Sequence, residues 1–138
     1  SGTTWATSAP GTLSSSTGAS TTFNASSSTS GPGSVTATLG SVHGEATVTV
    51  TATAPPAPTN LVAALRGKRV TLSWSGSGAT YSVYRGATSG GEALYRSGVS
   101  GTTFTDSSVP SGTWYYQVTA VGPGGESTRS SEVSVRVK

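Results

Sequence analysis

The sequence has no cysteine, a single histidine and few charges. Among its 138 residues, Cys is absent, His occurs once and charged residues make up 9%. The chain therefore forms no disulfide bond, thiolate metal site or cysteine nucleophile, and it has little material for acid–base chemistry. It also has no run of Lys or Arg and no apolar run near about 18 residues, the length of a membrane helix. We therefore expect no cofactor, no metal, no nucleic-acid partner and no membrane insertion.

Small polar residues dominate what is present. The chain contains 26 Ser, 24 Thr and 19 Gly. Helical bundles are instead rich in Ala, Leu, Glu and Lys, so this composition does not suit a helical fold.

A proline-rich segment, Ala54-Pro55-Pro56-Ala57-Pro58, divides the chain. Prolines lack the amide donor of a sheet ladder and prefer an extended conformation. We interpret residues 55–58 as a short, semi-rigid linker. It separates a first unit, residues 1–54, from a second unit, residues 59–138.

The second unit has the pattern of short strands separated by Gly, Ser and Pro turns. Apolar and polar residues alternate, most clearly over residues 70–74 and 114–120. Seven such strands, with turns at intervals of about 8–12 residues, predict a β-sandwich.

The order of these motifs resembles a bacterial fibronectin type III domain over the whole second unit. The matching stretches are Val70-Thr71-Leu72-Ser73-Trp74, Tyr81-Ser82-Val83-Tyr84-Arg85, Phe104-Thr105-Asp106 and Gly112-Thr113-Trp114-Tyr115-Tyr116-Gln117-Val118-Thr119-Ala120-Val121. The resemblance implies that Trp74 is the core tryptophan. Trp114 lies where the family usually has its corner tyrosine, and an indole donates one hydrogen bond but accepts none.

The first unit also shows strand alternation, with apolar Val35, Ala37, Val48 and Val50 separated by threonines. Together with Thr4-Trp5-Ala6-Thr7-Ser8, Gly11-Thr12-Leu13 and Thr22-Phe23, these stretches resemble the later part of a bacterial immunoglobulin-like domain. The resemblance implies that the first two strands of that domain are missing. We therefore expect an all-β chain of two tandem immunoglobulin-like β-sandwich units. We also expect another protein chain or an upstream segment to cover the inner face of the incomplete first unit.

Candidates for catalysis are few. His43, expected in a hairpin turn from Gly40 to Gly44, has no second His or Cys to act with. The five carboxylates fall in turns or near strand ends, and we expect Asp106 to bind backbone groups of the bend that follows it. We therefore predict no catalytic residue and no enzymatic activity for this chain.

Two tyrosines are the basis of one candidate contact patch. Tyr84 and Tyr115 alternate outward on strands that are neighbours in the resembled fold, with Arg85 and Gln117 nearby. Such a patch fits a sugar ring or a protein partner. The alternative is an ordinary cross-strand pair on a solvated sheet face.

The resemblance implies a non-catalytic structural or assembly module of a secreted or cell-surface bacterial protein. The incomplete first unit favours completion by strand donation, as in a fibre, filament or oligomer. One alternative is a carbohydrate-binding or spacer module of an extracellular polysaccharide-degrading enzyme, for which a polysaccharide is the partner. Another is a phage tail or capsid appendage.

Overall fold

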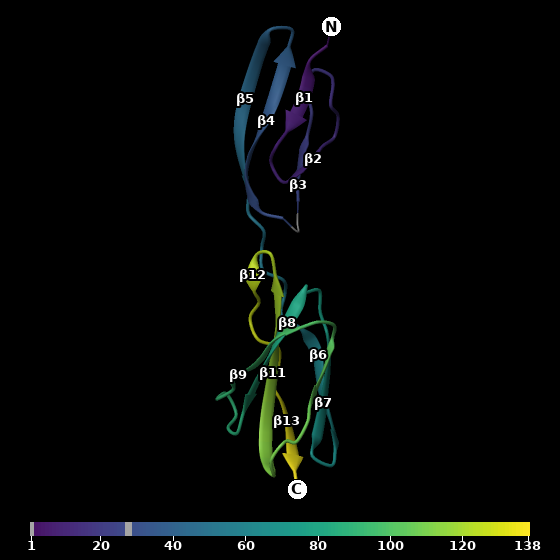
Figure 1. Ribbon diagram of the computed structural model, residues 1–138, viewed down its shortest axis with the longest axis vertical. Helices are drawn as coiled ribbons and strands as arrows, with labels where there is room; N and C mark the ends of the chain where they lie inside the picture. The colour runs from purple at the N-terminus through teal and green to yellow at the C-terminus, as the bar shows by residue number, and fades with distance from the viewer. Residues whose placement is uncertain (1, 27–28) are drawn as a thin grey trace. The chain divides into compact units, whose positions relative to one another are not determined.

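The computed structural model describes residues 2–26 and 29–138, and every regular element in this part of the chain is a β-strand (Figure 1). The chain divides into two compact units, Ser1–Thr53 and Ala54–Lys138. Each unit contains two sheets, which confirms the predicted all-β fold of two tandem immunoglobulin-like units. The described residues form no helix that could span a membrane.

The first unit combines a three-stranded sheet with a short two-stranded one. Strand β4 (Gly31–Leu39) lies between β1 (Thr4–Thr7) and β5 (Val42–Val50), and all three are antiparallel. Strand β2 (Gly11–Leu13) pairs with β3 (Phe23–Ala25). Figure 1 shows this short pair beside the three-stranded sheet.

The register of the three-stranded sheet places its apolar residues on one face. Trp5 pairs with Ala37, and Val35 pairs with Ala46, so these side chains point the same way. Even so, Trp5 on β1 and Phe23 on β3 are only half-buried. The buried apolar side chains in the described part of this unit are those of Ala9 and Val50.

The hairpin of the first unit is tighter than the sequence suggested. Its turn consists of Gly40 and Ser41, and the strands pair up to Leu39 and Val42. Gly40 has a φ of +60°, a conformation that suits a two-residue turn. The expected turn at 40–44 was therefore wrong: His43 lies within β5, exposed and opposite Thr38.

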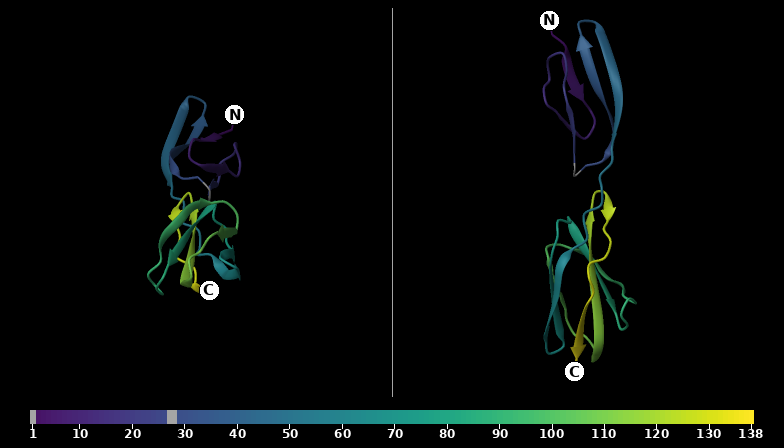
Figure 2. Two further views of the ribbon diagram at one scale, coloured as in Figure 1. Left: turned by 60° about the horizontal axis from the view of Figure 1, so that its bottom comes forward. Right: turned by 180° about the vertical axis from the view of Figure 1, so that it is seen from behind.

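The second unit is a sandwich of two antiparallel sheets. One sheet has the order β10 (Thr103–Asp106), β7 (Arg69–Ser75), β6 (Thr59–Arg66). In the other, β8 (Thr80–Gly86) lies between β9 (Ala93–Val99) and the long β11 (Gly112–Gly122), whose free edge pairs with β12 (Gly125–Glu126) and β13 (Val133–Val137). The right-hand view of Figure 2 shows the two sheets facing each other.

Apolar side chains of both sheets pack into one buried cluster. It contains Leu61, Val70, Leu72, Trp74, Tyr81, Val83, Val109, Tyr116, Val118, Ala120 and Val137. Trp74 is 5% exposed, and its ring meets that of Tyr81 edge-on with centroids 5.3 Å apart. Trp74 is therefore the core tryptophan that the resemblance implied.

Trp114 forms a hydrogen bond across the connection between β10 and β11. Its indole Nε1 donates a hydrogen bond of 2.9 Å to the carbonyl oxygen of Pro110. A corner tyrosine makes the same kind of bond to backbone a few residues upstream. Because this bond requires only a donor, tryptophan can replace tyrosine here.

The proline segment lies against the second unit. Pro58 is buried, and a Cβ placed on Gly122 would come within 2.9 Å of the Pro55 Cγ. Glycine at 122 therefore lets the chain at Pro55 pass close to the end of β11.

Candidate functional site

Three of the four residues of the predicted contact patch share the outer face of the larger sheet. Tyr84 on β8 lies directly opposite Gln117 on β11, and Tyr115 lies opposite Gly86 two positions along. All three side chains are half-buried. We call Tyr84, Tyr115 and Gln117 the outer patch.

Arg85 does not belong to this patch. It follows Tyr84 in β8 and therefore points to the opposite face, where it pairs in register with Tyr116. Its guanidinium lies 3.9 Å from the centre of the Tyr95 ring and 4.6 Å from that of Trp114. Grouping Arg85 with the outer tyrosines was wrong because alternation along a strand separates neighbouring residues.

Asp106 is the polar centre of the inner face. This residue is 1% exposed. It accepts hydrogen bonds from Arg85 Nη1 at 2.8 Å and from the hydroxyls of Tyr95 and Tyr116 at 2.9 Å each. The pKa values of Tyr95 and Tyr116 are raised above the ordinary value, mainly by burial and in addition by the hydrogen bond to Asp106. The expectation of backbone partners for Asp106 was wrong, since distant side chains take up its oxygens.

The ring and hydroxyl of Tyr84 are both engaged on the outer face. The hydroxyl donates to Glu126 Oε1 at 2.7 Å, and Thr119 donates to the same oxygen. The Arg129 guanidinium lies 4.1 Å from the centre of the Tyr84 ring. The two hydroxyl donors lower the pKa of Glu126, while the bond to Glu126 is the main cause that raises the pKa of Tyr84.

Gln117 is also engaged. Its Nε2 donates to the Ser130 carbonyl oxygen and its Oε1 accepts from Arg129 Nη1, each at 3.2 Å. Within the described part of the chain, Tyr115 is the member of the outer patch whose side chain makes no hydrogen bond. The irregular segment between β12 and β13 therefore contacts Tyr84 and Gln117 through Arg129 and Ser130 and makes no such contact with Tyr115.

Two neighbouring carboxyl groups are those of Glu132, which belongs to this segment, and Glu92, which precedes β9. The Glu92 side chain is 0% exposed, and Arg129 Nη1 lies 3.9 Å from its Oε2. Glu132 accepts hydrogen bonds from the Ser89 hydroxyl and the Gly90 amide. Burial is the main cause that raises the pKa of Glu92, and a hydrogen bond with the adjacent Glu132 raises it further. The same hydrogen bond, together with those from the Gly90 amide and the Ser89 hydroxyl, lowers the pKa of Glu132.

A carboxyl group with a raised pKa, Glu92, next to one with a lowered pKa, Glu132, resembles the acid and base pair of glycosidases. The Glu92 carboxyl, however, is closed to solvent, so a substrate has no access to it. His43 and Glu45 are exposed on β5 of the first unit. Among the described residues, no group of three or more His, Cys, Asp or Glu side chains is placed to hold a metal ion.

Comparison with known proteins supports the resemblance seen in the second unit. No family model matches the chain. An amylopullulanase of Thermoanaerobacterium saccharolyticum is 45% identical over 85 residues, which cover 57% of this chain and 6% of that enzyme. The chain thus spans a small fraction of this much longer relative.

Solved structures agree with this relationship. A fibronectin type III-like protein from Clostridium thermocellum is 33% identical, with a TM-score of 0.57, over 62% of this chain and 96% of that one. A structure of titin domains matches 99% of this chain and 54% of its own, with a TM-score of 0.60. Its identity is 16%, so this second likeness concerns the fold alone.

Proposed function

Since the chain belongs to the fibronectin type III family through its second unit, we propose that it is a non-catalytic accessory module of an extracellular polysaccharide-degrading enzyme. The observation that carries the proposal is the 45% identity with an amylopullulanase over 85 residues, 6% of that enzyme. A segment of that size in a long enzyme fits an accessory domain better than a catalytic one.

The outer patch favours a spacer role over a site that stacks on neutral sugars. Sugar stacking needs an open aromatic face, and Arg129 lies over the ring of Tyr84. The hydroxyl of Tyr84 is bound to Glu126. Together these contacts occupy the ring face and the hydroxyl of Tyr84, which a sugar would need.

The test uses the whole chain with two neutral polysaccharides, pullulan and soluble starch. We expect no release of reducing ends and no retention on either polymer, with Tyr84→Ala/Tyr115→Ala behaving like the unmodified chain. Hydrolysis by the purified chain would overturn the non-catalytic role. Retention that the double substitution abolishes would replace the spacer by a sugar-binding face.

A second candidate function is assembly through the first unit. Strand β5 is nine residues long and forms an edge of its sheet, and the aromatic side chains on the inner face are half-buried. Open edges of this kind accept added strands. Unfolding of the first unit that shifts to higher temperature with protein concentration would favour this function over the spacer.

A further inference from the structure

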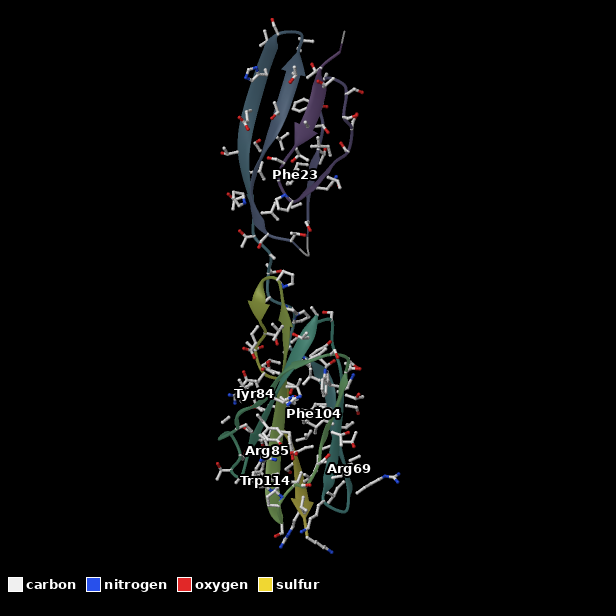
Figure 3. The ribbon with its side chains drawn as sticks, viewed as in Figure 1. Phe23, Arg69, Tyr84, Arg85, Phe104 and Trp114 are labelled. Atoms are coloured by element: carbon white, nitrogen blue, oxygen red, sulfur yellow. The ribbon has the colours of Figure 1, made fainter. Side chains whose placement is uncertain are left out.

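Three positive charges are concentrated at one end of the second unit. Arg66 ends β6 and Arg69 begins β7, and the two are direct partners across the hairpin. Gly67 and Lys68 form the turn between them. All three basic side chains are exposed, and Figure 3 shows Arg69 projecting away from the ribbon.

A second loop, residues 107–110, lies next to these three basic residues. The Val109 amide donates a hydrogen bond of 2.8 Å to the Lys68 carbonyl oxygen, and Val109 is fully buried. The preceding Ser108 has a φ of +65°, a conformation that serine seldom adopts and that often marks a functional loop. The hairpin and the loop are thus held together by the backbone.

The hairpin and the loop line an open depression of the surface with a volume of about 630 Å³. Its polar lining consists of the three basic side chains with Ser107 and Ser108, and its apolar lining consists of Val109 and Pro110. We call this depression the basic pocket. Every charged side chain that lines it is positive.

No carboxylate in the described part of the chain neutralises these charges. The two ion pairs among the described residues join Arg85 to Asp106 and Arg129 to Glu92. Asp106, the carboxylate next to the loop in sequence, is buried and turned toward Arg85. Like charges directly opposite in a sheet are destabilising, so the Arg66–Arg69 pair lacks a structural explanation within the second unit.

We propose that the basic pocket binds the anionic groups of an acidic polysaccharide. Guanidinium groups bind carboxylate and sulfate through paired hydrogen bonds, and the hydroxyls of Ser107 and Ser108 add further donors. The pocket lining contains no aromatic side chain on which a nucleic-acid base would stack. That the anionic groups belong to a polysaccharide rests on the proposed function. That the pocket binds anionic groups rests on its basic lining alone.

The test measures affinity of the full chain for polygalacturonate, which carries carboxylates, and for dextran sulfate, with uncharged dextran as the reference. We expect binding to at least one polyanion and none to dextran. The Arg66→Gln/Arg69→Gln variant should weaken binding at least about tenfold, because each residue makes a charged hydrogen bond. The preferred polymer identifies the anionic group.

The matched controls separate this pocket from diffuse charge. Arg69→Gln alone should weaken binding severalfold, whereas Arg96→Gln, an equal charge change at an exposed site on β9, should leave it nearly unchanged. The thermal midpoint of both pocket variants should be equal to or above that of the unmodified chain, since the repulsion between the arginines is relieved.

Three results would overturn the proposal. They are the absence of polyanion binding, an equal loss in Arg96→Gln and Arg69→Gln, and a preference for duplex DNA over both polysaccharides. None of them affects the accessory role, which depends on the tests with neutral polymers. Conversely, hydrolysis of pullulan by the chain would end the accessory role without changing the anion affinity of the pocket.

Discussion

The two units bury their apolar residues to very different extents. In the second unit, side chains from both sheets form a continuous cluster in which Val70, Val83 and Tyr116 are fully buried. In the described part of the first unit, Ala9 and Val50 are the buried apolar residues, and Trp5 and Phe23 stay half-buried. Buried apolar area is the main source of folding stability. Although apolar and polar residues alternate along the strands of both units, we therefore expect the second unit to have the larger free energy of unfolding.

The difference lies in the size of the second sheet against which the three-stranded sheet of each unit packs. The second unit has a three-stranded sheet facing a larger one, so inward residues meet a complete partner surface. In the described part of the first unit, the second sheet is the short β2–β3 pair beside the three-stranded sheet. Alternation thus fixes which way a side chain points, and the opposing layer decides how far it is buried.

The largest effect is expected at the centre of the second unit. Trp74→Ala should lower the free energy of unfolding of this unit by about 3–5 kcal/mol, because it removes a large buried ring. Chemical denaturation followed by circular dichroism measures the change. An unfolding midpoint equal to that of the unmodified chain would show that Trp74 does not hold the core together.

The next effect concerns the polar centre of the second unit, which has no counterpart in the described part of the first. Asp106→Ala should cost about 3 kcal/mol, because it leaves the partly buried Arg85 without its partner. The control is Glu45→Ala on β5, an exposed change expected to stay within about 0.5 kcal/mol. Equal midpoints for the two variants would contradict the structural role of Asp106.

A smaller effect is expected in the first unit. Phe23→Ala should cost about 1–2 kcal/mol, less than the full value for a buried phenylalanine, because the ring is half-buried. Thermal unfolding of the whole chain should show a shift confined to the first unit. A loss as large as that of Trp74→Ala would mean that the two cores are equally well covered.

The smallest effect is a pH dependence of the second unit. The pKa of Glu92 lies above its ordinary value of 4.5 in the folded chain, so its contribution to stability is complete below pH 4.5 and is lost as the pH rises through the raised pKa. Glu126 and Glu132, with lowered pKa values, act in the opposite sense and lose their contribution as the pH falls below 4.5. Glu92→Gln stays neutral at every pH.

Thermal midpoints measured from pH 4 to pH 8 test this behaviour. The midpoint of the unmodified second unit should fall relative to that of Glu92→Gln as the pH rises above 4.5, because Glu126 and Glu132 contribute alike to both proteins. Parallel curves for the two proteins would show that Glu92 does not titrate within this range.

The sequence predicts strands well where alternation coincides with burial. Strands β7 and β11 have this property, with Leu72 and Val118 fully buried. Strand β9 lacks it: Leu94 and Tyr95 are 58% and 42% exposed, and its pairing with β8 shifts register. A bulged strand on a sheet edge leaves little periodic signal in the sequence.

The candidate site was harder to predict because its partners are distant in sequence. Alternation already indicated that Arg85 shares a face with Val83, but Asp106, its partner, is 21 residues away. The Arg129 side chain that covers Tyr84 comes from an irregular segment, where no period assigns a direction. Register places Tyr84 beside Gln117, but only the folded chain shows what lies over them.

Amide hydrogen exchange on the intact chain tests the difference between the two units most directly. Exchange reports the free energy of opening each hydrogen bond, from nearly zero up to that of global unfolding. We predict that amides of β8 and β11 exchange slower, by orders of magnitude, than those of β4, although β4 is also central in its sheet. Equal protection of β4 and β11 would contradict the account, because it would show that the first unit is as well closed as the second.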